Sequence, residues 1–259
     1  MTYDDWIAHF ESAPPRQRAL EAGVPWDAPC ELPPRQRDAL VRSLQRFALG
    51  EDGDGASLLA KARAAGDPGY VRALELLVAE EQRHAALFRR GLAHLGGAEL
   101  RAHWSDAAFT LLRRSLGLRT EIALFLVAEA VSTPWFVALA DAAPDPVLRG
   151  IGRRVATDER DHLRFQVDRL RQGFASTPAP VRGAVLLAWT VVAAGAATVL
   201  VVDHGGALRA CGLTRLGTWR EGLATFRRAA SAALAGGAPL GPTTAAAARP
   251  TTTAGAAAG

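Results

Sequence analysis

Cysteine, tyrosine and lysine are all scarce in this chain of 259 residues. The two cysteines, Cys30 and Cys211, are isolated, and their spacing matches neither a disulfide framework nor a Cys-x-x-Cys metal site. Lys61 is the sole lysine among 30 basic residues, the arginines are scattered, and the net charge is only +4. We therefore expect no nucleic-acid partner, in spite of a calculated pI near 9.8.

Composition divides the chain into three parts. Residues 1–32 are rich in proline and predict an N-terminal arm, and residues 33–235 carry helical patterns throughout. Residues 236–259 contain mainly Ala, Gly, Thr and Pro, which cannot bury a core and predict a disordered tail. The N-terminus has no apolar core of a signal peptide, so we expect a cytoplasmic protein.

Apolar residues recur at helical spacing, which predicts an all-α protein. In the arm, one short helix is expected around Trp6 to Phe10, and the near-repeat Pro-Pro-Arg-Gln-Arg at 14–18 and 33–37 indicates two helix starts. The later helices are expected at residues 34–51 with a continuation at 57–65, and at 68–95, 98–116, 119–140, 146–173, 183–202 and 215–234.

One polar motif occurs twice on these helices. Glu80-Glu81-Gln-Arg-His84 lies in an apolar stripe that should face the core, and Asp158-Glu159-Arg-Asp-His162 repeats it 78 residues later. An Asp-Pro pair precedes each motif at the same distance, as expected for a capped helix start. Buried carboxylates and imidazoles need partners, and a metal ion is one solution.

A further glutamate precedes each motif by 30 residues, namely Glu51 and Glu129. That distance is long enough for the chain to turn and return beside the first helix. Glu51 stands in the acidic, glycine-rich stretch 50–55, which indicates either a surface loop or a helix that opens beside the site. Asp52 and Asp54 are the alternatives to Glu51.

The resulting set of four glutamates and two histidines resembles that of the ferritin-like di-iron carboxylate superfamily, over roughly residues 36–175. The resemblance implies a ferritin-like four-helix bundle with an N-terminal arm and one or two additional C-terminal helices. It also implies two iron ions, or manganese, as cofactors. One metal would be held by Glu51, Glu81 and His84, and the other by Glu129, Glu159 and His162, with Glu81 and Glu159 bridging.

Three more residues are candidates for supporting roles. Metal-bound histidines usually donate their second N–H to a carboxylate, and Asp158 and Glu80 are placed to accept it. For Glu80, a solvated surface position is the alternative. Thr133 lies one turn after Glu129, where the resemblance to multicomponent monooxygenases implies proton handling during oxygen activation. The alternative is a hydroxyl that bonds back to a backbone carbonyl.

The resemblance implies a di-iron oxygenase or oxidase that uses O₂ and an unidentified electron donor to oxidise a small organic substrate, like p-aminobenzoate N-oxygenase-like and acyl-carrier-protein desaturase-like proteins. Hydroxylation, N-oxygenation and desaturation all remain open. The alternative is a ferroxidase or iron-storage protein. Radical generation is disfavoured, because Tyr70 would lie about 16 Å along the helix from Glu81.

The stretch 183–202 contains no charged residue and is just long enough to span a membrane. A fifth helix buried against the bundle is the rival interpretation, and we favour it because there is only one such stretch. Membrane contact through residues 183–202 and a homodimer both remain compatible with the sequence.

Overall fold

The computed structural model describes residues 1–235, which form helices with no strand among them. The predicted all-α class is therefore confirmed for this part of the chain. The predicted disordered tail, residues 236–259, lies outside the described residues.

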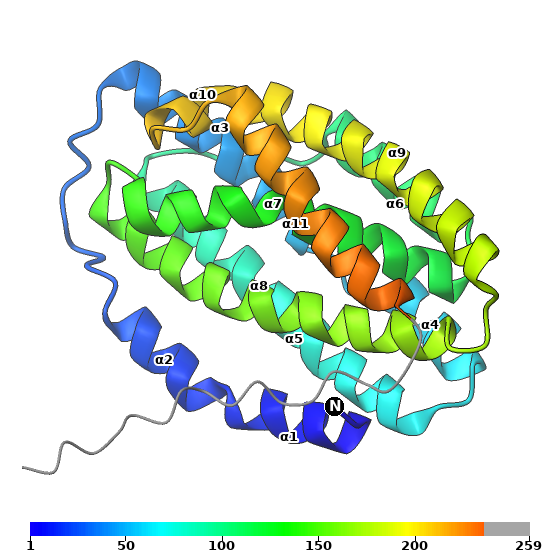
Figure 1. The fold of residues 1–259 in the computed structure, drawn as a ribbon. Coiled ribbons are helices and arrows are strands. Elements are labelled where there is room, and N and C mark those ends of the chain that lie inside the picture. Colours follow the sequence, from blue (N-terminus) through cyan, green and yellow to red (C-terminus); the bar gives the residue numbers. More distant parts are fainter. Residues whose placement is uncertain (236–259) are drawn as a thin grey trace, which may run out of the picture.

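The N-terminal arm contains two helices, α1 (Tyr3–Ser12) and α2 (Pro14–Ala22), where the sequence indicated one short helix and a helix start at residue 14. Thr2 caps α1 in a reciprocal arrangement with Asp5. Figure 1 shows both helices along one edge of the molecule, where α1 packs on α5 and α2 packs on α8. The arm thus covers the two helices that carry the repeated motif.

The centre of the fold contains α3 (Pro34–Glu51), α5 (Pro68–His94), α7 (Leu118–Ala142) and α8 (Pro146–Gly173). Asp67 caps α5 through the backbone N–H of Tyr70, and Asp145 caps α8 through two backbone N–H groups. The two motifs therefore begin at the same distance from their helix starts. This arrangement is compatible with a ferritin-like fold.

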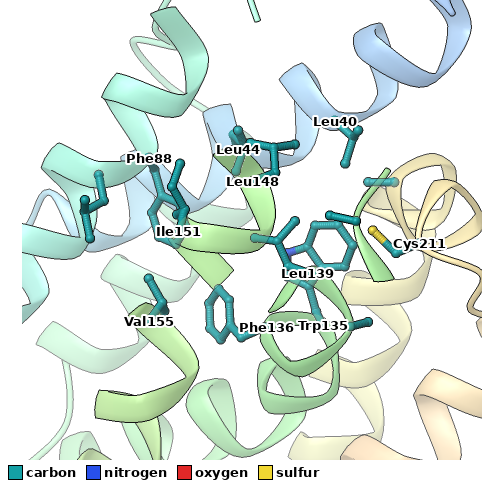
Figure 2. Close-up of a cluster of buried hydrophobic side chains, with 14 of the residues drawn as sticks. Leu40, Leu44, Phe88, Trp135, Phe136, Leu139, Leu148, Ile151, Val155 and Cys211 are labelled. Carbon is teal, nitrogen blue, oxygen red and sulfur yellow. The ribbon is translucent and has the colours of Figure 1, made fainter. Parts of the chain in front are cut away.

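Large apolar side chains from all four helices fill one end of this bundle (Figure 2). Leu44 comes from α3, Phe88 from α5, Trp135 from α7 and Leu148 from α8, and each is at most 1% exposed. At Gly152 of α8 a side chain would collide with the backbone of α7, because an added Cβ would lie 2.4 Å from the Ala140 nitrogen. Close approach of α7 and α8 thus depends on this glycine.

The chain breaks beside the motif, as the glycine-rich stretch indicated. Helix α3 ends at Glu51, Gly55 adopts a left-handed conformation with φ 63°, and α4 (Ala56–Ala64) continues the chain. The sole lysine, Lys61, points from α4 to the end of α6 (Trp104–Arg114). Its Nζ donates to three carbonyl groups there and lies 2.6 Å from the buried carboxylate of Glu121 on α7.

The C-terminal part of the described chain forms α9 (Ala179–Asp203), α10 (Gly205–Ala210) and α11 (Arg215–Leu234). Helix α11 crosses α7 and α8 and lies beside α9 (Figure 1). Two helices, α7 and α9, are long and apolar enough to cross a membrane. In its most apolar stretch α7 is 72% buried, as expected for a core helix, whereas α9 is only 22% buried.

The expectation of a buried helix at 183–202 therefore holds for one side of α9 only. Ala193, Ala197, Leu200 and Val201 are buried, Leu186 and Trp189 are partly buried against the core, and the opposite side of the helix faces outward. Helix α9 lies outside the four central helices and can bury only the face that meets α7 and α11.

Candidate metal centre

Four side chains from α5 and α8 converge in the interior of the bundle. Glu81 and His84 come from α5, Glu159 and His162 come from α8, and one nitrogen or oxygen atom of each lies within 4.8 Å of the others. His162 Nδ1 lies 2.7 Å from Glu81 Oε1, and His84 Nδ1 lies 3.4 Å from Glu159 Oε1. Each imidazole thus faces the glutamate of the other helix, in a buried Glu/His cluster that could hold a metal ion.

The other two glutamates of the predicted set lie against this cluster. Glu51, the last residue of α3, lies beside Glu81 and keeps some solvent exposure because it also borders a cavity. Glu129 of α7 is 9% exposed, and its Oε1 accepts a hydrogen bond from Gln166 of α8. All six residues singled out by the repeat are therefore brought together, whereas Asp52 pairs with Arg89 on the surface.

Several atoms that point into the cluster have no hydrogen-bond partner. They are Glu81 Oε1, His84 Nδ1, Glu129 Oε2, both carboxylate oxygens of Glu159, and His162 Nδ1. The close contact between His162 and Glu81 does not have hydrogen-bond alignment. A buried polar atom without a partner costs about 1–3 kcal/mol, and a charged one costs more. Metal ions would satisfy these atoms together.

Electrostatics within the cluster lead to the same requirement. Burial, followed by the charge of Glu81, raises the pKa of Glu51 well above its usual range. Burial and the charge of Glu159 do the same for Glu129. Burial opposes protonation of His162, but the charge of Glu81 and a hydrogen bond with Glu80 outweigh it and raise the pKa of His162. The residues therefore fit divalent cations, which would neutralise the crowded carboxylates.

The histidines are oriented by acids on the opposite helix. Asp158 Oδ2 accepts from His84 Nε2 at 3.1 Å, and Glu80 Oε2 accepts from His162 Nε2 at 3.0 Å. Both acids are almost completely buried, so the solvated alternative for Glu80 does not describe this structure. Because Nε2 is engaged, the Nδ1 atom of each ring is left free to face the cluster.

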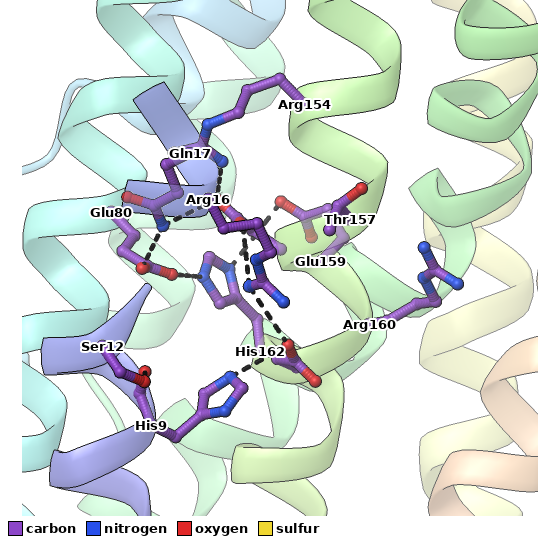
Figure 3. A network of polar contacts seen from close by, with 12 residues as sticks. His9, Ser12, Arg16, Gln17, Glu80, Arg154, Thr157, Glu159, Arg160 and His162 are labelled. Carbon is purple, nitrogen blue, oxygen red and sulfur yellow. Dashed lines mark hydrogen bonds and ion pairs between the residues drawn. The ribbon is translucent and has the colours of Figure 1, made fainter. Parts of the chain in front are cut away.

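The N-terminal arm closes this side of the cluster (Figure 3). Gln17 of α2 is 3% exposed, and its amide donates to Glu80 and, at 3.3 Å, to Asp158. Arg154 contacts Asp158 and joins it to Glu21 of α2 at 3.1 Å. No local pattern in the sequence points to Gln17, Arg154 or Gln166, because their roles depend on how separate helices dock.

Thr133 adopts the simpler of its two expected arrangements. Its hydroxyl donates to the carbonyl of Glu129 at 2.8 Å, one turn earlier on α7. A role of Thr133 in proton handling stays a prediction.

A cavity reaches the cluster at three of its glutamates. It lies between α5, α6, α7 and the break after α3, and Glu51, Glu81 and Glu129 form its inner end. The space inside it that water-sized molecules can occupy is about 70 Å³, and all space between the atoms, including the opening to solvent, is about 720 Å³. Most of the wall is apolar or aromatic, and α6 adds a polar edge formed by Asp106, Thr110 and Arg113. The apolar part consists of Leu58, Tyr70, Leu74, Leu77, Val78, Phe109, Ile122, Phe125 and Phe165.

A second group of ligand-type side chains, Cys30, His94 and Asp145, lies elsewhere in the fold. It differs from the buried cluster because His94 and Asp145 satisfy each other. His94 Nε2 lies 2.9 Å from Asp145 Oδ2, and the other oxygen of Asp145 caps α8. Unpartnered buried atoms therefore distinguish the Glu/His cluster from this group.

Comparison of the chain with protein-family models, curated proteins and solved structures found no match. Within the described residues, the site is therefore defined by its own geometry: a helical bundle, compatible with a ferritin-like fold, with a buried glutamate and histidine cluster that could bind metal.

Proposed function

We propose that the chain is a non-haem di-iron oxygenase or oxidase of the ferritin-like superfamily, which oxidises a small organic substrate. The observation that carries this proposal is the cavity, whose apolar walls end at three of the six clustered ligand residues. A substrate bound there would lie against the carboxylate side of the centre, and the arm closes the histidine side.

In this proposal Glu51, Glu81 and His84 hold one metal ion, and Glu129, Glu159 and His162 hold the other. Two iron ions at these positions would supply the redox chemistry that activates O₂, with electrons from an external donor. Carboxylate and imidazole donors suit iron or manganese, and thiolate is absent from the set. Asp158 and Glu80 keep the two imidazoles in the tautomer that presents Nδ1 to the metals.

The cavity walls support oxidation of an organic molecule. The aromatic rings of Phe109, Phe125 and Phe165 line the space and would disfavour water beside a bound substrate. A dry site protects reactive species from side reactions and strengthens electrostatic interactions. The polar edge formed by Asp106, Thr110 and Arg113 would orient a polar group of the substrate.

Iron storage is the alternative function, and the two differ in how much iron they process. An oxygenase should stop after oxidising the iron that its own ligands hold, whereas a storage protein should continue and deposit mineral. Mixing the metal-free protein with a large excess of ferrous iron in air separates the two. We expect oxidation to stop near two irons per chain. His162→Ala lacks one of the proposed ligands and should oxidise iron only at the rate seen without protein.

Sustained oxidation with ferric mineral would overturn the proposal in favour of storage. The substrate part has its own test, in which iron-loaded protein is mixed with O₂ in a stopped-flow spectrometer. Small aromatic acids and amines should change the rate at which the oxygen-dependent absorption decays. Insensitivity to every compound tested would contradict a substrate cavity.

A further inference from the structure

Helix α9 presents an apolar face to solvent along its whole length. Its large exposed side chains are Val181 at 49%, Leu187 at 69%, Val191 at 67%, Val192 at 39% and Val202 at 60%. These fractions correspond to an apolar area on the order of 500 Å², which is at the upper end of what monomeric proteins expose in one patch. A partner surface of some kind is therefore expected on α9.

The exposed residues follow the spacing of a helix-pairing seam. Every one of the following positions is exposed, and the steps between them alternate strictly between three and four residues: Val181, Ala184, Ala188, Val191, Gly195, Thr198 and Val202. Such a seven-residue repeat keeps one stripe facing a neighbouring helix. The middle of the stripe contains small residues, which allow two helix backbones to approach closely.

The same seam fits a second copy of itself in the antiparallel direction. When two α9 helices cross at Val191, Ala188 of one copy faces Gly195 of the other, and Val181 faces Val202. The charges favour this direction, because a parallel pair would bring Arg182 of both copies together near the start of α9, whereas an antiparallel pair separates them. Asp203 at the end of α9 is 11% exposed and lies 3.8 Å from Arg46 of α3, so it adds little across the seam.

The available area also suits a dimer. A standard interface buries about 800 Å² on each partner. The large side chains supply more than half of this, and the small exposed residues of the seam add to it.

We propose that α9 is a homodimer interface, in which it pairs with α9 of a second copy in antiparallel orientation about a twofold axis at Val191. The mass of the purified full-length protein in sedimentation experiments tests this directly. Wild type should have twice the 27.3 kDa mass of one chain. Ala188→Glu should raise the dissociation constant of the dimer about a hundredfold or more, because it buries a charge at the seam.

A charge exchange tests the orientation. Gly195 has open space around it, so Gly195→Lys should fold normally. Combined with Ala188→Glu, it places a lysine opposite each new glutamate only in the antiparallel pair, and should restore the dimer. Ala8→Glu is the matched control, because Ala8 is exposed on α1, which Figure 1 shows on the opposite side of the molecule from α9. This control should remain dimeric.

Cross-linking provides a second measurement that does not depend on a charged variant folding. With Cys30 and Cys211 replaced by serine, Val191→Cys should form a disulfide-linked dimer on mild oxidation. A monomeric wild type overturns the proposal, as does a dimer that Ala188→Glu leaves unchanged. If monomeric wild type floats with vesicles of phosphatidylcholine and phosphatidylglycerol, α9 binds a lipid surface and the dimer proposal is overturned.

Discussion

Replacing Gln17 by leucine tests whether the N-terminal arm belongs to the metal centre. The Gln17 amide donates to Glu80 and Asp158, which orient the two histidines, and its carbonyl oxygen accepts from Arg83 at 3.2 Å. Leucine has nearly the same volume and none of these hydrogen bonds. Gln17→Leu should therefore leave the packing of α2 intact and remove its polar link to the centre.

The size of the effect follows from the remaining partners. A hydrogen bond to a charged group contributes about 1.5–3 kcal/mol, and Gln17 makes two to buried carboxylates. The third, from Arg83, adds little because Arg83 is 45% exposed. Glu80 keeps His162, and Asp158 keeps His84 and Arg154, so we expect a loss near the lower end, about 3 kcal/mol. For a domain of this size this loss lowers Tm by about 6–12 °C. Metal affinity should fall about 10–100-fold, as for other residues that orient metal ligands.

The chain contains its own control for this variant. Gln36 occupies the same place in the repeated Pro-Pro-Arg-Gln-Arg sequence but is exposed at the start of α3. Calorimetry with chelator present gives the loss of stability, and competition with a chromophoric chelator gives the loss of manganese affinity. Equal values for Gln17→Leu and Gln36→Leu would refute a role of the arm in the centre.

Three further predictions concern the cluster and its surroundings. Burial and the neighbouring carboxylates raise the pKa of Glu51 and Glu129, so these groups stabilise the metal-free protein at low pH and lose that contribution as the pH rises through their folded pKa values. In chelator, Tm should therefore fall as the pH rises above about 4.5, the ordinary pKa of a glutamate. Added Mn²⁺ should stabilise more at higher pH because bound carboxyls must be ionised, and a flat Tm profile would contradict this. Thr133→Val should keep two metals bound and alter the rate of the oxygen-dependent absorption change, and an unchanged rate would leave Thr133 only its backbone hydrogen bond. Lys61→Met should lower the free energy of unfolding by about 2–3 kcal/mol. This is less than the loss expected when a fully buried ion pair is broken, because Lys61 is 24% exposed although Glu121 is fully buried. An unchanged free energy of unfolding in denaturant would exclude this pair as a stabilising contact.

The fold was largely predictable because its signals are local. Asp67 and Asp145, each followed by proline, mark the starts of the two long helices, and the apolar stripes define their inner faces. The offset between the halves then predicts that Glu51 and Glu129 return beside the repeated motif. The helix starts and inner faces follow from helix geometry alone, whereas the complete set of six residues is recognised through its resemblance to ferritin-like di-iron proteins.

The remaining features depend on docking, which a single sequence does not encode locally. Asp158 supports His84 of the opposite helix, although His162 is nearer in sequence. Gln17 and Gln36 share one local sequence, yet only Gln17 is buried, because α2 lies on α8 over the cluster. Hydropathy likewise could not distinguish the two faces of α9, since the buried and exposed sides are both apolar.

The number of metal ions per chain tests the central claim most directly. Anaerobic loading of the metal-free protein with ferrous iron, removal of unbound metal and elemental analysis give this number. We predict two irons per chain for wild type, a marked loss in both His84→Ala and His162→Ala, and full loading of His94→Ala, which alters the self-satisfied second group. Wild-type protein without iron, or His84→Ala and His162→Ala variants that both retain two irons, would contradict the assignment of the buried cluster as a di-metal centre.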